Sequence, residues 1–267
     1  MVTQHEKGVR FRTLHEGEPF VIPNPWDAGS AKVLAGLGFE ALATTSSGFA
    51  FTLGRHDSGV SFDEVVEHTR ALVDAVDVPI SVDLENGYGP EPAQAAFAIE
   101  RAAEAGAVGG SIEDYDPGGG RIYELGHAVE RVSAAVEAAR ELDFPFTLTA
   151  RAENHIRDNP DLDDTLARLQ AFERAGADVL YAPGLRTVEE ITAVCDTITK
   201  PVNVLARPKL SLADIAGAGA KRVSLGGSLA FLAVSAMASA AEAIRDDGDF
   251  GPIRLGPELG RWLGSLS

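Results

Sequence analysis

The feature that most constrains this fold is a repeat in which a short apolar run precedes an alanine-rich amphipathic segment. The runs have the length and β-branched content of buried strands, and the segments have the 3.6-residue period of helices. Eight such pairs follow one another, with strands predicted at residues 20–25, 41–46, 79–85, 109–114, 146–153, 179–183, 201–206 and 222–227. The helices are predicted at residues 27–37, 61–76, 91–105, 124–142, 162–175, 188–197, 212–216 and 228–245.

Strand and helix pairs of about 30 residues indicate a parallel sheet, and eight of them indicate an α/β fold of the closed (β/α)8 TIM barrel type. Several predicted helices end in a glycine signal such as "LAGLGFEAL", where glycine adopts the left-handed cap conformation. No change in composition marks a linker, so residues 1–267 are predicted to form one barrel domain, with residues 228–267 as its C-terminal helical segment. An open, doubly wound sheet is the alternative.

The charge of the chain disfavours two classes of partner. Asp and Glu number 40 against 23 Lys and Arg, so neither a nucleic-acid backbone nor an anionic membrane is an expected partner. No apolar run reaches the roughly 18 residues of a spanning helix, and residues 1–20 lack the apolar core of a signal peptide, so a cytoplasmic location is expected. The single cysteine, Cys195, excludes an internal disulfide and a thiolate-rich metal site.

Polar side chains gather at the carboxyl ends of the predicted strands, where barrel enzymes place their active sites. Because these ends share one face of the barrel, we expect the side chains to line one site. In chain order they are Asn24, Trp26, Asp27, Thr44, Thr45, Ser46, Ser47, Asp83, Glu85, Glu113, Asp114, Arg151, Glu153, Tyr181, Asn203 and Arg207.

Three of these acids predict the chemistry. Asp83 and Glu85 lie two residues apart, on one face of a strand, and Glu113 ends the next strand along the chain. Converging carboxylates repel one another unless a cation neutralises them, and oxygen ligands without a nearby His or Cys cluster favour Mg²⁺. Arg151 supplies a fixed cation for an anionic substrate. The alternative is a structural salt-bridge network that caps the barrel.

The segment "TTSSG", residues 44–48, offers backbone N–H groups after the second strand. These groups could form a nest for an oxyanion or a carboxylate, although a plain polar loop explains the pattern as well. No lysine occupies a strand end, which disfavours a Schiff-base aldolase.

Five segments together resemble the phosphoenolpyruvate mutase and isocitrate lyase superfamily, which includes carboxyvinyl-carboxyphosphonate phosphorylmutase-like and 2-methylisocitrate lyase-like enzymes. They are "NPWDAGSAKVLAGLGFEALATTSSGFAFTLGRHDS", "SVDLENGYG", "GGSIED", "TARAENHI" and "RAGADVLYAPG". In particular, "VDLENGYG" is similar to the metal-binding segment D-A-D-x-G-Y-G, with Glu85 in place of its second Asp. The resemblance implies a (β/α)8 barrel that binds Mg²⁺ or Mn²⁺ through Asp83, Glu85 and Glu113, largely by way of water.

The resemblance also implies roles for other residues. Thr45, Ser46 and Ser47, with the backbone of Gly48, would contact the substrate; Asp57 would close over it, and Arg151 would hold its carboxylate. The strand-end residues Trp26 and Asn203 complete the candidate substrate site. Members are often tetramers, dimers of dimers, whose last helix is exchanged between subunits, so a homo-oligomer is expected.

One loop departs from the family pattern. After the fourth strand the lyases carry K-[KR]-C-G-H and the phosphonate enzymes carry a lysine and an asparagine, whereas residues 113–132 read "EDYDPGGGRIYELGHAVERV". Pro117 and the three glycines after it suit a lid, and Tyr115 and Tyr123 are candidate catalytic residues that would reach the substrate on closure. A solvated connection is the alternative.

These observations predict a Mg²⁺-dependent lyase that cleaves a C–C bond of a small 2-oxo or 2-hydroxy carboxylic acid through an enolate, by retro-aldol cleavage or decarboxylation. One alternative is a P–C mutase or hydrolase acting on a phosphonopyruvate-like acid. Another is a catalytically silent barrel used for binding or assembly.

Overall fold

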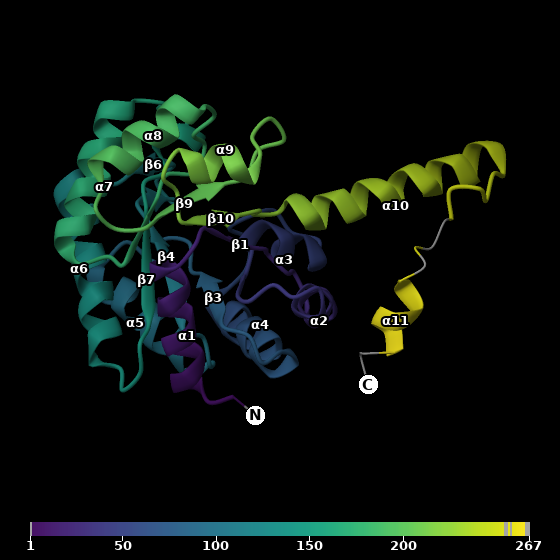
Figure 1. The fold of residues 1–267 in the computed structure, drawn as a ribbon, viewed down its shortest axis with the longest axis horizontal. Coiled ribbons are helices and arrows are strands. Elements are labelled where there is room, and N and C mark those ends of the chain that lie inside the picture. Colours follow the sequence, from purple (N-terminus) through teal and green to yellow (C-terminus); the bar gives the residue numbers. More distant parts are fainter. Residues whose placement is uncertain (1, 254–255, 257, 265–267) are drawn as a thin grey trace.

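Eight parallel strands form the centre of the structure, a computed structural model that describes residues 2–253, 256 and 258–264. The strands follow the spatial order β1-β10-β9-β8-β7-β4-β3-β2, and helices surround them (Figure 1). Each strand falls inside a range predicted from the sequence. Their bounds are β1 (Phe20–Ile22), β2 (Leu42–Ala43), β3 (Ile80–Asp83), β4 (Gly109–Glu113), β7 (Thr147–Arg151), β8 (Val179–Tyr181), β9 (Val202–Leu205) and β10 (Arg222–Ser224).

The two ends of this sheet meet and close the barrel. The Ala43 N–H donates to the carbonyl of Pro23 at 3.1 Å, and the Asn24 amide donates to the carbonyl of Thr44 at 2.9 Å. These bonds join the segments of β1 and β2, which share no ladder of their own. The closed (β/α)8 barrel is therefore confirmed, and the open sheet is wrong.

One helix follows each barrel strand, as the periodicity predicts. Most of them begin at a capping residue whose side chain accepts from the backbone of the first turn, as Ser61 and Thr187 do. The helices are α2 (Ala28–Gly36), α4 (Phe62–Ala75), α5 (Pro92–Glu104), α6 (Leu125–Glu141), α7 (Leu162–Ala175), α8 (Val188–Thr197), α9 (Leu212–Gly217) and α10 (Ser228–Asp247).

The outer layer packs closely because its inward faces are rich in alanine. On α5, Ala95 and Ala98 are fully buried, and Ala135 on the neighbouring α6 is also fully buried. They share one apolar cluster with Leu84 and Leu148 of the sheet region. Small side chains let helix backbones approach one another and the sheet, which keeps the barrel wall rigid beneath the site.

Some elements were not predicted from the sequence. The helix α1 precedes the barrel, and its Phe11 is fully buried beside Ile22 and Val108. The other additions lie in loops or near the C-terminus. They are α1 (Gln4–Glu16), α3 (Ser46–Thr52), β5 (Tyr115–Asp116), β6 (Arg121–Ile122), the 3₁₀ turn η1 (Asn154–Ile156) and α11 (Leu259–Gly264).

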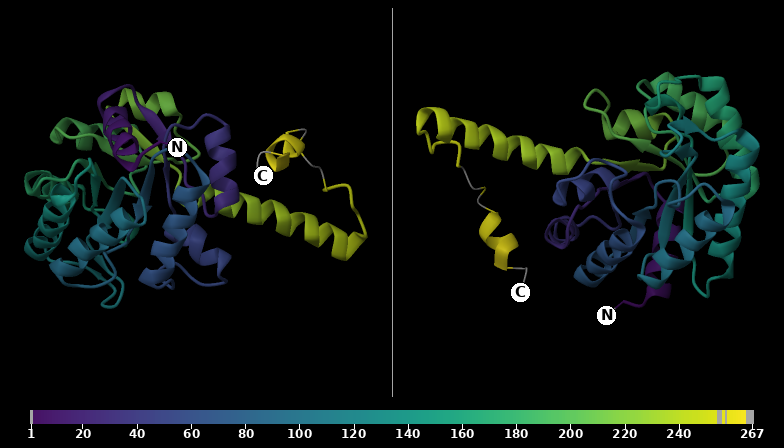
Figure 2. Two further views of the ribbon diagram at one scale, coloured as in Figure 1. Left: turned by 90° about the horizontal axis from the view of Figure 1, so that it is seen from below. Right: turned by 180° about the vertical axis from the view of Figure 1, so that it is seen from behind.

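The last barrel helix, α10, leaves the barrel and extends into solvent (Figures 1 and 2). Of its residues only Ala230 is buried, whereas Leu232 and Met237 are 66% and 64% exposed. With 20 residues and a mean hydropathy of 1.3, α10 is long and apolar enough to cross a membrane, judged by length and composition only. The expectation that no segment of the sequence reaches this length and apolarity was therefore wrong. The sequence pattern missed this helix because its many alanines and serines separate the large apolar residues, so that no continuous run of large apolar side chains is visible.

Candidate active site

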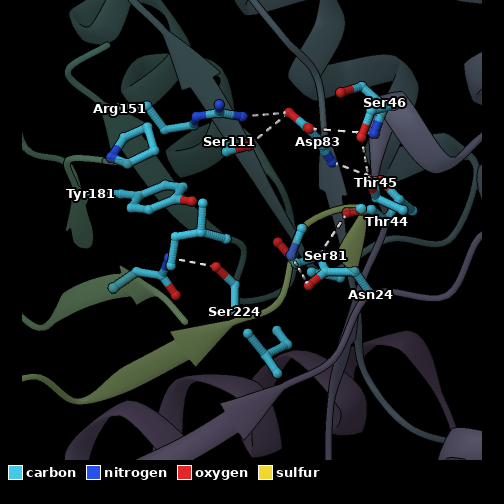
Figure 3. A pocket seen from close by; sticks show the side chains of 18 of the residues that line it. Asn24, Thr44, Thr45, Ser46, Ser81, Asp83, Ser111, Arg151, Tyr181 and Ser224 are labelled. Atoms are coloured by element: carbon cyan, nitrogen blue, oxygen red, sulfur yellow. Dashed lines mark hydrogen bonds and ion pairs between the residues drawn. The ribbon is translucent and has the colours of Figure 1, made fainter. Parts of the chain in front are cut away.

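A pocket of about 200 Å³ opens among the carboxyl ends of the strands (Figure 3). Ten of the residues named from the sequence line it: Asn24, Thr44, Thr45, Ser46, Ser47, Asp57, Asp83, Arg151, Tyr181 and Asn203. Glu85 and Glu113 lie close behind its wall, and Trp26, Gly48, Tyr115 and Tyr123 are also outside its lining. Ser81, Ser111, Arg222 and Ser224 contribute further polar groups.

Arg151 is the centre of the acid cluster. Its guanidinium contacts Asp83 at 2.8 Å, Glu113 at 3.1 Å and Glu153 at 2.9 Å. Strand register explains the grouping, since Glu113 and Arg151 are paired across β4 and β7, and Asp83 ends the adjacent β3. Figure 3 shows the Arg151 side chain pointing at Asp83 across the top of the pocket.

A second guanidinium reaches the same acids from the loop after β7. Arg157 lies 3.5 Å from both Glu113 and Glu153. Glu153 is fully buried, and burial together with the charge of Glu153 raises the pKa of Glu113 well above its usual value. The sequence pattern included Glu153 among the strand ends without assigning it a role, and nothing in the pattern indicated Arg157 as its partner.

Glu85 reaches the cluster by a route that strand alternation did not predict. The strand ends at Asp83, and Glu85 has a positive φ of 47°, so it belongs to a turn rather than to one face of β3. Its carboxylate accepts from the Tyr88 hydroxyl at 3.1 Å. Burial, and next the charge of Asp83, raise the pKa of Glu85 to about 7. Asp83 and Glu85 therefore interact electrostatically as expected, but the turn after β3 brings them together rather than their position on one face of the strand.

The charges of this cluster fit a hydrated divalent cation. Four carboxylates (Asp83, Glu85, Glu113, Glu153) face two guanidiniums, and burial, followed by the charges of neighbouring acids, raises the pKa values of Glu85 and Glu113. Within the described part of the chain, no three His, Cys, Asp or Glu side chains form a ready-made metal site. An ion at these acids would therefore be held largely through water, and Mg²⁺ is a cation that retains several of its waters in proteins.

The "TTSSG" segment begins a helix, so neither a nest nor a plain loop describes it. Thr45 caps α3 by accepting from the Gly48 N–H, and the N–H of Ser46 points to Asp83 at 3.5 Å. The first turn of a helix has N–H groups without partners in the helix, and these favour an anion. Gly48 packs closely against Thr45, because a Cβ at position 48 would lie 2.6 Å from the Thr45 side chain.

Comparison with known proteins identifies the family of this chain. Residues 11–245 match the family model of phosphoenolpyruvate phosphomutase. This chain belongs to the phosphoenolpyruvate phosphomutase family. A crystal structure of a candidate lyase/mutase from Burkholderia cenocepacia J2315 matches it with a TM-score of 0.94 and 49% identity, over 97% of this chain and 96% of that one.

Curated relatives of this phosphomutase-family chain have more than one activity. The uncharacterised protein Rv1998c of Mycobacterium tuberculosis is 30% identical over 87% of both chains. 2-Methylisocitrate lyase of Escherichia coli is 28% identical over 74% of this chain and 69% of that protein. Oxaloacetate decarboxylase of Paraburkholderia xenovorans is 30% identical over 74% and 67%. Because the chain has similar sequence identity to enzymes with two different activities, its reaction has to be inferred from the residues of the site.

The loop that departs from the family pattern forms a short β-hairpin, β5–β6, beside the acid cluster. The Arg157 guanidinium lies 3.7 Å from the centre of the Tyr115 ring, so Tyr115 is held at the rim. Tyr123 points away from the pocket, because its hydroxyl accepts from the Asn86 amide at 3.0 Å and its ring packs under Arg131. Trp26 is likewise outside the lining, with its carbonyl in contact with His68 at 3.0 Å.

Proposed function

We propose that this protein is a Mg²⁺-dependent lyase that cleaves a C–C bond of a small 2-oxo or 2-hydroxy carboxylic acid by way of an enolate. The observation that supports this most strongly is the set of Asp83, Glu113 and Arg151 beside the first turn of α3. Together they combine an excess of carboxylate charge with donors for an oxyanion. Relatives named as a lyase and a decarboxylase of such acids agree with the proposal.

In this proposal Asp83, Glu85 and Glu113 would hold Mg²⁺, and the bound ion would supply Lewis-acid stabilisation of negative charge on the substrate oxygen. The first turn of α3, where the Ser46 N–H points to Asp83, would place a hydrogen-bond donor beside the same oxygen. Arg151 positions the substrate carboxylate, and its three carboxylate contacts hold its guanidinium in one orientation. The electrons of the broken C–C bond pass into the enolate, which is then protonated, while the other fragment leaves as the second product.

The departure of the hairpin from the family pattern favours decarboxylation or a simple retro-aldol cleavage. Decarboxylation needs the enolate site but little acid–base machinery, and the hairpin has neither Lys nor Cys. Tyr115, at the rim, is the better placed of the two candidate tyrosines to meet a substrate.

We also propose that the protein is a homo-oligomer in which α10 packs against another subunit. Leu232, Met237 and Phe231 are 66%, 64% and 43% exposed on this helix. A helix with exposed apolar side chains is stabilised when a partner covers them.

The test is stabilisation by Mg²⁺ and oxalate, a mimic of an enolate of pyruvate. Together they are expected to raise the Tm of the wild-type protein by several degrees, because ligands that bind only the folded state stabilise it. Asp83→Ala should remove this shift and reduce turnover at least about 100-fold, since it removes a proposed ligand at the site of charge development. Turnover is assayed on a panel of 2-oxo and 2-hydroxy acids by NMR detection of the products.

The matched control is Asp196→Ala, which removes an exposed carboxylate from α8 far from the pocket. It should retain the ligand-induced shift. A wild-type protein whose Tm does not respond to Mg²⁺ and oxalate, or an Asp83→Ala variant that still responds, would contradict the enolate site.

A further inference from the structure

Arg222 is a buried cation at the floor of the pocket whose role the proposed reaction does not explain. It begins β10, is 5% exposed and lines the cavity. Its guanidinium points into the barrel and donates to the side chains of Asn203 at 2.8 Å and Thr149 at 2.9 Å, and lies 3.3 Å from the imidazole of His15. Thr149 precedes Arg151 by two residues on β7, so Arg222 lies one layer below Arg151.

All three hydrogen-bond partners of Arg222 are neutral. The Nδ1 of His15 lies 2.8 Å from the Phe11 carbonyl and must donate to it, which leaves Nε2 as the acceptor for Arg222. Among the described residues, no carboxylate forms an ion pair with this guanidinium. Burial lowers the pKa of Arg222 to about 10, so it remains charged at neutral pH. A buried charge with neutral partners is costly, and an anion would compensate it.

The contrast with Arg151 is informative. Arg151 contacts three carboxylates, so its guanidinium already has charged partners within the chain before a substrate arrives. An anion entering the pocket therefore gains more from Arg222, whose charge is not compensated. Tyr181 separates the two layers, with Arg151 over its ring at 5.3 Å, and Figure 3 shows it between Arg151 and Ser224.

The space to admit an anion exists because small side chains line this part of the barrel. Ala43, Ser81 and Ser111 lie on the strands opposite Arg222, where other residue types would fill the interior. The guanidinium has five N–H donors, and only three of them are used by the contacts above. A carboxylate can accept from the remaining donors and from nearby Asn203.

We propose that Arg222 forms a second carboxylate subsite at the floor of the pocket, distinct from the acid cluster above it. The substrate is then a dicarboxylic acid that spans two layers. Its reacting end lies at Asp83 and the start of α3, and its distal carboxylate is bound by Arg222. This inference rests on the proposed function for the reacting end, and the position of the distal carboxylate is new.

The test compares two ligands that differ only at the distal end. Malate and 2-hydroxybutyrate share a 2-hydroxy acid group, and the first has a carboxylate where the second has a methyl group. Their Kd values are measured by calorimetry in chloride-free buffer with Mg²⁺. The wild-type protein should bind malate at least about tenfold more tightly, the lower limit expected of a hydrogen bond to a charged group. In Arg222→Gln this preference should disappear, with 2-hydroxybutyrate binding changed by less than about threefold.

A second variant keeps the inference testable if Arg222→Gln fails to fold. Thr149→Asp places a carboxylate where the guanidinium already donates, and so supplies an internal counter-ion. It should raise or maintain the Tm while removing the preference for malate. A wild-type protein without this preference, or a preference that survives in the folded variants, overturns the subsite. A chloride-dependent rise in Tm that requires Arg222, without a preference for malate, would assign the subsite to an inorganic anion and also overturn it.

Oxalate separates this inference from the proposed function. If Arg222→Gln retains the Tm shift with Mg²⁺ and oxalate but wild type shows no preference for malate, the subsite is wrong and the enolate site stands. If oxalate fails while the malate preference depends on Arg222, the subsite stands and the lyase proposal is wrong.

Discussion

His15, on the helix α1 that the sequence pattern did not predict, gives the buried residues a measurable pH signature. It is 6% exposed, and burial and the neighbouring charge of Arg222 lower its pKa to about 3. The histidine therefore stays neutral in the folded protein at all physiological pH values. In the unfolded chain it titrates near pH 6.5.

This difference predicts a loss of stability on acidification. Between pH 6.5 and 3 the unfolded state binds one more proton at this position, so the free energy of unfolding falls by about 1.4 kcal/mol per pH unit. Wild type should therefore lose about 2 kcal/mol relative to His15→Gln between pH 7 and pH 5. Urea unfolding of both proteins at the two pH values measures this. An equal gap between wild type and His15→Gln at the two pH values would refute the assignment.

At the same scale, sequence reasoning located most of the polar side chains that line the pocket. Asp83, Ser46, Arg151 and Asn203 were named from their position at strand ends, and all line the cavity. The method depends on where each apolar run ends, because the carboxyl ends of the barrel strands share one face. It failed for Glu85, because the positive φ that turns this residue toward Asp83 belongs to the loop.

Among the elements, α10 differs most from its expected environment. The periodic pattern predicted a helix at residues 228–245, and the helix exists, but it leaves the barrel instead of packing on it (Figure 1). Leu229 packs partly against the barrel, whereas Leu232 and Met237 face solvent. An amphipathic pattern predicts that one face of a helix is buried. It does not predict whether that face packs against the same subunit or against another one.

An exposed apolar helix leads to a prediction about assembly. Leu232→Glu should lower the molecular mass in solution, measured by light scattering, because a charge buried at an apolar interface is costly. The control is Leu212→Glu, at an exposed leucine of α9 that is 46% exposed. If wild type is monomeric, or if the variant retains the wild-type mass, α10 is not an interface helix.

The short hairpin β5–β6, in contrast to α10, was not predicted from the sequence at all. Its strands have two residues each, and a glycine-rich sequence does not reveal so short an antiparallel pair. The pairing of Tyr115 with Ile122 and the contact of Arg157 with the Tyr115 ring fix it at the rim. The contact between Arg157 and Tyr115 joins residues 42 positions apart, which local patterns cannot predict.

For the molecule as a whole, the barrel depends on how β1 and β2, the two ends of the sheet, are joined. Asn24 accepts from the N–H groups of Leu225 and Gly226 at 2.8 and 2.9 Å and donates to the Thr44 carbonyl at 2.9 Å. One side chain thus links the ends of β1, β2 and β10. It also lines the pocket, so closure of the barrel and shape of the site are coupled.

Asn24→Ala should therefore lower the free energy of unfolding by about 2–4 kcal/mol, because three backbone groups lose a buried partner. Chemical denaturation measures this, and the exposed Asn159→Ala serves as the control. A loss below about 0.5 kcal/mol, the range of a neutral surface substitution, would show that closure does not depend on this residue.

The sequence by itself determined the eight strand and helix pairs, the barrel, and the acids and arginine that end its strands, because each follows from local periodicity. Only the tertiary structure decided that Arg151 is surrounded by carboxylates whereas Arg222 has none, that Tyr123 faces away from the pocket, and that α10 leaves the barrel. These depend on contacts between distant residues, whose energies are set by burial and by neighbouring charge.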